Sequence, residues 1–151
     1  MLDSTSRFGQ SARVSQRDQK PVLVIDGSRF DDFDGFAVEF SKLLTDYTWR
    51  GNLDAFNDIL RGGFGTPEGG FVLRWSRSDL SRSALGYGAT AARLESLLGT
   101  CHPTNRESIA ARLEDAQRHV GPTLFDELVE IIETHGPGGI GADSGVELDL
   151  R

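Results

Sequence analysis

The sequence predicts an α/β fold in which a small three-stranded parallel sheet is packed with helices. Three short segments have strand character: the apolar run 22–25, the segment 71–75 and the alternating segment 146–150. The long stretches between them carry helical periodicity, and long helical connections imply parallel pairing with right-handed crossovers. A chain of 151 residues is long enough to form one domain with a real core.

The first strand and helix follow from local signals. The run 22–25 is β-branched and is closed by a turn at 26–27, as in a buried strand. Asp32 or Asp34 can cap a helix that runs to about Leu44. The side chains expected to point inward from this helix are Phe36, Phe40, Leu43 and Leu44.

A second helix is predicted over 53–61. Asn52 can accept hydrogen bonds from the free amides of its first turn, and Gly62 and Gly63 favour an ending because that position often needs a positive φ. The side chains expected on the buried side are Leu53, Phe56, Ile59 and Leu60. The side chains left on the outer side are Asp54, Asn57, Asp58 and Arg61.

Two carboxylates dominate the outer side of this helix. Asp54 and Asp58 are four residues apart, and like charges at that spacing destabilise a helix by roughly 0.2–0.5 kcal/mol. Asp54 recovers part of this from the positive helix N-terminus, whereas Asp58 lies one turn further in. The pair fits either a solvated helix face or a surface that binds a cationic partner.

The rest of the chain is mainly helical. Short helices are expected over 78–85 and 90–98. Thr104 to Glu107 and Thr123 to Asp126 both have the spacing of a capping box, which starts a helix. The inward residues expected in these last two helices are Ile109, Leu113, Ala116 and Val120, then Leu124, Leu128, Ile131, Ile132 and His135.

Charge and composition narrow the function classes. The chain holds 16 Lys and Arg against 23 Asp and Glu, for a net charge of −7, and residues 1–20 carry a basic excess. Residues 21–151 are therefore more acidic still and repel nucleic acid, since nucleic-acid binding depends on cations that neutralise phosphates. Such a domain attracts a basic protein instead.

Residues 1–20 show no apolar period and are expected to form a flexible tail, separate from a domain at 21–151. The tail has no apolar core of a signal peptide, and no segment has the length of a membrane span. Cys101 is the single cysteine, so no intrachain disulfide forms. These features predict a cytoplasmic protein.

Other constellations point away from cofactors and metals. Residues 136–141 spell G-x-G-x-x-G, but a dinucleotide site needs this motif after a strand and before a helix. Cys101, His102, His119 and His135 match no zinc spacing, and His135 is expected to be a cation at a helix C-terminus. We expect neither a metal site nor a cofactor.

Several of these segments together resemble the barstar family of ribonuclease inhibitors. VIDGSRFDDFDGFAVEFSKLL at 24–44 resembles the family's first strand and helix, and WRGNLDAFNDIL at 49–60 resembles its binding helix. FVLRW at 71–75 is similar to the second strand, and 123–151 is similar to the last helix and strand. The resemblance implies a barstar-like fold, with residues at about 83–122 as an extra helical insertion.

The resemblance also implies a function and a set of contact residues. It implies an intracellular protein inhibitor whose acidic helix blocks the active site of a basic bacterial ribonuclease or ribonuclease toxin, as an immunity protein does. Asp54 and Asp58 match the family's carboxylates. The contact residues expected on this basis are Tyr47, Trp49, Asp54, Asn57, Asp58, Arg61 and Gly62. The free protein is expected to be a monomer and not an enzyme.

Two departures from the family keep other functions open. Asn57 and Arg61 stand where the family inhibitor has Trp and Thr, and residues 83–122 have no counterpart in it. The same fold could therefore serve as a protein-binding module with a target other than a nuclease. A hydrolase using Asp54 and Asp58 is a third possibility, which would require a cleft and carboxylates with separated pKa values.

Overall fold

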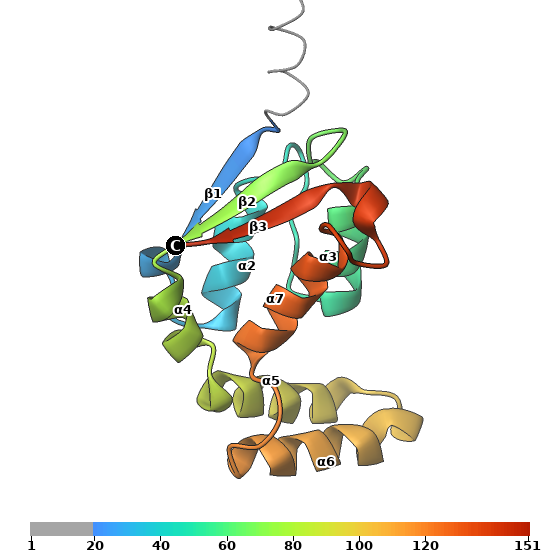
Figure 1. Cartoon of the computed structure of the whole chain (residues 1–151). Helices are drawn as coiled ribbons and strands as arrows, with labels where there is room; N and C mark the ends of the chain where they lie inside the picture. Colours follow the sequence, from blue (N-terminus) through green and yellow to red (C-terminus); the bar gives the residue numbers. More distant parts are fainter. Residues whose placement is uncertain (1–19) are drawn as a thin grey trace, which may run out of the picture.

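The computed structural model describes residues 20–151 and has the α/β fold that the sequence predicts. Its strands are β1 (Val22–Asp26), β2 (Phe71–Ser76) and β3 (Val146–Leu150). They form one parallel sheet in the order β1-β2-β3 (Figure 1). Apart from Lys20, the predicted tail lies outside the described residues.

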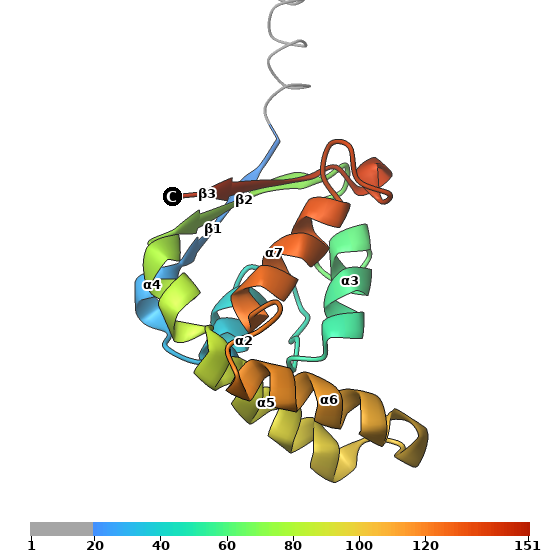
Figure 2. The same cartoon turned by 60° about the horizontal axis from the view of Figure 1, so that its bottom comes forward.

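The helices lie mainly on one face of this sheet. They are α2 (Phe33–Ser41), α3 (Leu53–Arg61), α4 (Ser78–Ala84), α5 (Tyr87–Thr100), α6 (Arg106–Gln117) and α7 (Leu124–Thr134), with short 3₁₀ turns η1 (Gly27–Arg29), η2 (Pro103–Asn105) and η3 (Ala142–Ser144). Figure 2 shows the sheet edge-on, with α2, α3 and α7 on the same side of it. None of the helices within residues 20–151 is both long enough and apolar enough to cross a bilayer.

The core lies between the sheet and these helices. Alternate residues of β2 point into it, and Phe71, Leu73 and Trp75 are each at most 1% exposed. The ring centroids of Trp75 and Phe36 on α2 are 5.0 Å apart. Phe36 also lies 6.2 Å from Phe56 on α3, so an aromatic chain connects the central strand to the acidic helix.

The other face of the sheet is open and partly polar. Val22 and Val24 on β1 are 44% and 48% exposed. On the neighbouring strands, Arg74 Nε donates to Asp149 Oδ2 at 3.0 Å, and Arg151 donates to the same carboxylate. These hydrogen bonds, from Arg151 and then Arg74, lower the pKa of Asp149 and keep it charged between two cations.

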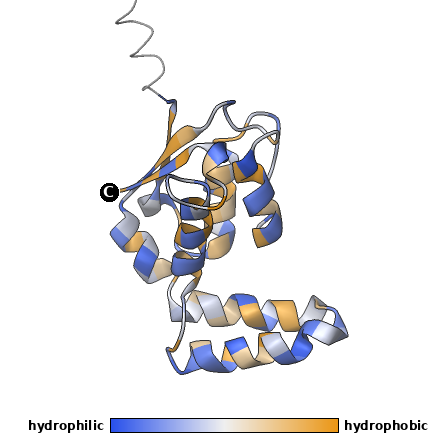
Figure 3. Ribbon diagram, turned by 45° about the vertical axis from the view of Figure 1, so that its right-hand side comes forward, coloured by the Kyte–Doolittle hydropathy of each residue, from blue (hydrophilic) through white to orange (hydrophobic). Residues whose placement is uncertain are grey.

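The insertion forms a helical hairpin beside the sheet, as predicted. Helices α5 and α6 pack against each other and contribute no strand. Thr90 Oγ1 accepts a hydrogen bond from the Leu124 amide at 2.8 Å, which ties the hairpin to the start of α7. Polar and apolar residues are mixed along the hairpin in Figure 3, consistent with its few buried side chains.

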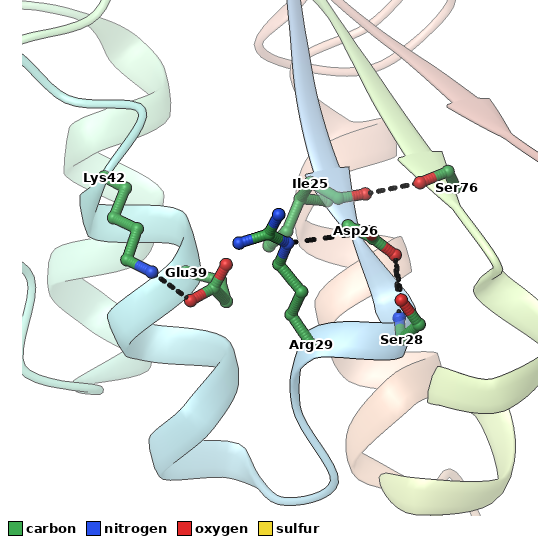
Figure 4. A network of polar contacts seen from close by, with 7 residues as sticks. All are labelled: Ile25, Asp26, Ser28, Arg29, Glu39, Lys42 and Ser76. Atoms are coloured by element: carbon green, nitrogen blue, oxygen red, sulfur yellow. Dashed lines mark hydrogen bonds and ion pairs between the residues drawn. The ribbon is translucent and has the colours of Figure 1, made fainter.

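The turn after β1 is held by polar contacts (Figure 4). Asp26 Oδ1 accepts hydrogen bonds from the Ser28 hydroxyl at 2.7 Å and from the Ser28 amide at 2.9 Å. These two bonds lower the pKa of Asp26. A Cβ at Gly27 would lie 2.4 Å from the Arg77 carbonyl oxygen, so the close approach of the two strand ends requires glycine here.

Two helix boundaries differ from the sequence prediction. The helix α2 begins after its cap Asp32, as expected, but ends at Ser41 and not near Leu44. Leu44 is still buried, because the following turns carry it back to the core. The helix α5 begins at Tyr87, three residues before the predicted start at Thr90.

The predicted capping box at Thr104 is wrong. Pro103 begins a separate 3₁₀ turn, and His102 Nδ1 accepts from the Thr104 amide at 3.2 Å. Consequently α6 starts one residue later than predicted, after Asn105, which makes no side-chain cap. The helix also ends before Val120, which is 54% exposed and not inward as predicted. The second box, at Thr123, is confirmed.

Gly70→Ala is expected to destabilise the fold by more than about 1 kcal/mol, because the native conformation does not admit a side chain. Gly70 has a φ of +98°, and an added Cβ would lie 2.3 Å from the Gly145 carbonyl oxygen. Gly88→Ala, within α5, is the matched control, since a Cβ added at Gly88 would have no neighbouring atom within 4 Å. It should stabilise by roughly 0.5–1 kcal/mol. Urea unfolding of both variants checks this; equal stabilities would contradict it.

Candidate functional site

The helix α3 presents the predicted acidic surface. Asn52 Oδ1 accepts from the Ala55 amide at 3.1 Å and caps its first turn, as predicted. Gly62 ends the helix with a φ of +112°. The apolar residues Phe56, Ile59 and Leu60 are at most 1% exposed, whereas Asp54, Asp58 and Arg61 are exposed.

Asp58 has one cationic neighbour on its own helix. Arg61 Nη1 lies 3.7 Å from Asp58 Oδ1, and the two side chains are 66% and 56% exposed. An exposed pair of this kind contributes about 0–1 kcal/mol, since water screens it and both side chains lose rotamer freedom. The Asp58 carboxylate can therefore exchange Arg61 for a partner's cation at little cost.

Trp49 packs against the buried side of α3 and does not lie on the exposed side with the carboxylates. Its side chain is 2% exposed, and its ring centroid is 4.8 Å from that of Phe56. The indole Nε1 donates to the Asn52 carbonyl at 2.8 Å, which holds the residue that caps α3. The 2% exposure leaves its side chain little area for the partner contact that the resemblance implies.

Asn57 is also engaged within the protein. Its Oδ1 lies 2.7 Å from His135 Nε2, and its side chain is half-buried at the edge of the acidic surface. His135, predicted both on the inner face of α7 and as a cation at its end, is 2% exposed. Burial, followed by the positive charge of Arg61, lowers the pKa of His135, so the ring is neutral at pH 7.

Two exposed aromatic rings lie together beside α3. Tyr47 and Phe64 are 36% and 41% exposed, and their ring centroids are 5.4 Å apart. The Thr45 amide donates to the Gly65 carbonyl at 3.0 Å, which joins the loop before α3 to the loop after it. Phe64 was not among the predicted contact residues, although its position after Gly62 and Gly63 was a usable signal.

The end of α3 borders a shallow depression. A groove of about 250 Å³ is lined by Arg61, Gly62, Glu68 and Asp143, among other residues. Gly62 contributes backbone only, and its amide donates to the Ile59 carbonyl at 3.0 Å. The groove extends the acidic character of the surface beyond the helix.

The insertion reaches the site through Arg93, a residue that sequence reasoning missed. The Arg93 guanidinium on α5 lies 4.8 Å from the centre of the Phe33 ring. Its Nη1 donates to the Gly51 carbonyl at 3.3 Å. Gly51 directly precedes the cap of α3, so the hairpin braces the loop from which the acidic helix begins.

The two carboxylates of α3 lie on an open surface. Within residues 20–151 no group of three or more His, Cys, Asp or Glu side chains is placed to hold a metal ion. Neither Asp54 nor Asp58 lines the groove at the end of α3. The glycine-rich loop 136–141 follows the C-terminus of α7, and the Gly141 amide donates to the Thr134 carbonyl, so it does not form a phosphate cradle.

Comparison with known proteins gives one match. The family model described as Barstar (barnase inhibitor) matches residues 20–132, which include β1, β2, α3 and the hairpin. Neither the curated proteins nor the solved structures contain a match to this chain.

Proposed function

The chain belongs to the barstar family, and from this premise we propose that it inhibits a bacterial ribonuclease by covering the active site with α3. The observation that carries the proposal is the structure of α3. Its exposed side carries two carboxylates, Asp54 and Asp58, and its opposite side is held in the core by buried apolar residues. A preorganised surface loses little conformational freedom on binding.

The chemistry of the surface matches that of a ribonuclease site. Such a site binds the phosphate of RNA with cationic side chains, and a carboxylate can take the place of that phosphate. Hydrogen bonds between Arg and a carboxylate are charge-assisted and directional. The exposed aromatic pair Tyr47 and Phe64, in the loops before and after α3, adds apolar area for a partner, and aromatic residues are enriched in protein interfaces.

This function requires no cofactor and one inhibitor per enzyme. It places the protein in the cytoplasm as a monomer, where it protects the cell from its own ribonuclease or from a ribonuclease toxin. The chain itself would not hydrolyse RNA. The acidic balance of the chain, at −7, favours encounter with a basic enzyme.

The proposal is tested by titrating the full-length chain into RNA-hydrolysis assays of barnase and of other basic bacterial ribonucleases. We expect inhibition of at least one enzyme, with the end point at one equivalent, and no hydrolysis by the chain alone. Turnover of RNA by the chain alone would support the hydrolase alternative. Absence of inhibition across the panel would contradict the proposal.

Arg61 is the observation that favours a second candidate, a binding module for a target other than a nuclease. It places an exposed cation on an otherwise acidic surface, 3.7 Å from Asp58. A cationic ribonuclease repels Arg61 unless one of its own acidic groups lies opposite. A non-nuclease target with an acidic patch would instead use Arg61 as an attractive contact.

Arg61→Ala distinguishes the two candidates. For a basic ribonuclease, the substitution removes a repulsive charge and releases Asp58, so affinity should rise, by up to about fivefold for an exposed charge. Arg118→Ala, which removes an equally exposed arginine from the end of α6, is the matched control and should have little effect. Calorimetric titration measures both. A large loss of affinity in Arg61→Ala for a bound protein that is not a nuclease would favour the second candidate, whereas the same loss for a ribonuclease would place one of its acidic groups opposite Arg61.

A further inference from the structure

His135 lies where four elements meet beneath one edge of the α3 surface. It follows the last residue of α7, and its carbonyl accepts from the Val146 amide at the start of β3 at 3.0 Å. Its ring bridges the two remaining elements. Nε2 lies 2.7 Å from Asn57 Oδ1 on α3, and Nδ1 lies 2.9 Å from Ser144 Oγ in η3.

These contacts define the form of the imidazole. The amide oxygen of Asn57 can only accept, so Nε2 of His135 carries the proton. Nδ1 is then the acceptor for the Ser144 hydroxyl. Both ring nitrogens of the neutral form are therefore paired, and the side chain is 2% exposed.

The glycine-rich loop 136–141 closes over this ring. A Cβ at Gly141 would lie 2.9 Å from His135 Nδ1, and a Cβ at Gly139 would lie 2.2 Å from the Thr134 carbonyl oxygen. The loop can approach so closely only because these positions lack side chains. The G-x-G-x-x-G segment thus covers the imidazole of His135 and shields it from water, a role unrelated to nucleotide binding.

We propose that His135 is a positioning residue for the α3 contact surface: its neutral, fully paired ring holds Asn57 in place. In mild acid a proton on Nδ1 ends its acceptance from Ser144 and puts a charge on a buried ring, which loosens that edge of the surface. Asn57 directly precedes Asp58 and lies one turn after Asp54, so its movement changes where the carboxylates point. The inference rests on the proposed function in treating this surface as the contact surface, and it adds regulation by pH.

The direction of the pH effect follows from the surroundings of the ring. The ionisable residues on the elements around it are Asp54, Asp58 and Arg61 on α3, Asp126, Glu127, Glu130 and Glu133 on α7, Asp143 in η3, and Glu147 and Asp149 on β3. Burial and Arg61 together lower the pKa of His135, whereas the unfolded chain keeps a value of about 6.5. The unfolded state therefore binds more protons just below pH 6.5, and the contribution of His135 to stability, complete above that pH, is lost as the pH falls.

The test is a ¹H–¹⁵N NMR titration of the labelled full-length chain from pH 8 to pH 5. We expect the Nε2–H tautomer at neutral pH, and a midpoint for His135 below the value of about 6.5 that an unperturbed imidazole has. The backbone amides of 53–61 and the Asn57 side-chain amide should shift with the His135 midpoint. A surface that stays unchanged while His135 titrates would overturn the inference.

Two variants separate positioning from general destabilisation. His135→Gln keeps a donor for Asn57 and removes the ionisation, so the amide shifts of 53–61 at that midpoint should vanish. In Asn57→Ala, His135 still titrates, but the helix amides no longer follow it. Persistence of the shifts in both variants would contradict the inference. None of these measurements uses a ribonuclease, so the outcome is independent of whether the proposed function holds.

Discussion

Replacing Asp58 with alanine is expected to weaken ribonuclease inhibition at least about thirtyfold. In the complex, the carboxylate would face Arg, Lys or His side chains that have lost their water. Its removal leaves those cations buried and unpaired, at a cost of about 2–5 kcal/mol. About 1.4 kcal/mol corresponds to a factor of ten in affinity. Inhibition constants of wild type and Asp58→Ala, measured with the same enzyme, give this ratio directly.

The same substitution should leave the free protein intact. Asp58 loses a screened pair with Arg61 and also loses its repulsion with Asp54, so the change in unfolding free energy should stay within about 0.5 kcal/mol. Asp54→Ala should weaken binding less. Glu130→Ala, on an exposed position of α7, is the control and should alter mainly the association rate and its salt dependence. Equal affinity of Asp58→Ala and wild type would show that α3 does not cover the active site.

Trp49→Ala is expected to have the largest effect on stability, about 3–5 kcal/mol. The substitution empties a site that is 2% exposed and lies against Phe36, Phe40 and Phe56. It also removes the hydrogen bond to the carbonyl of Asn52, the cap of α3. Chemical unfolding measures the loss, which for a domain of this size is a large part of total stability.

Tyr47→Ala is the matched control, because Tyr47 is an aromatic residue two positions earlier that is 36% exposed. It should change stability by no more than about 0.5 kcal/mol and should lower affinity for the ribonuclease. The two substitutions thus distinguish a residue that stabilises the fold from a residue that contacts the ribonuclease. If Trp49→Ala kept full stability and lost affinity alone, the assignment of Trp49 as a supporting residue would be wrong.

The sheet and α3 were predictable because their signals are local. The alternation of Val146, Leu148 and Leu150 reflects one face of a strand, and the spacing of Phe56 and Leu60 reflects one side of a helix. Asn52 and Gly62 mark the ends of α3 through their own side-chain and backbone chemistry. Nothing distant is needed to interpret these patterns, and the structure agrees with them.

The errors arose where neighbouring residues compete for the same backbone groups. The spacing from Thr104 to Glu107 fits a capping box, but Pro103 favours a preceding turn and the His102 ring takes the Thr104 amide. In α2, the pattern of apolar residues continues to Leu44 although the helix stops at Ser41. An apolar side chain can return to the core through a turn, so periodicity alone overestimates the helix.

The supporting residues of the site depend on contacts across the chain, which one sequence does not reveal. Arg93 approaches Gly51 from 42 positions away, and His135 approaches Asn57 from 78 positions away. The spacing of His135 predicted the inner face of α7, but its place at the helix end also predicted a cation there. Its burial under a glycine loop outweighs that effect, and only the folded chain shows the loop lying there.

The central claim, that α3 occupies the active site of a ribonuclease, is tested most directly by competition. A ribonuclease that the chain inhibits is titrated calorimetrically with the full-length chain, with and without a saturating mononucleotide phosphate bound in its active site. We expect the apparent affinity to fall as the nucleotide concentration rises, by the factor that simple competition for one site requires. Unchanged affinity in the presence of the nucleotide, or no binding in its absence, would contradict the claim.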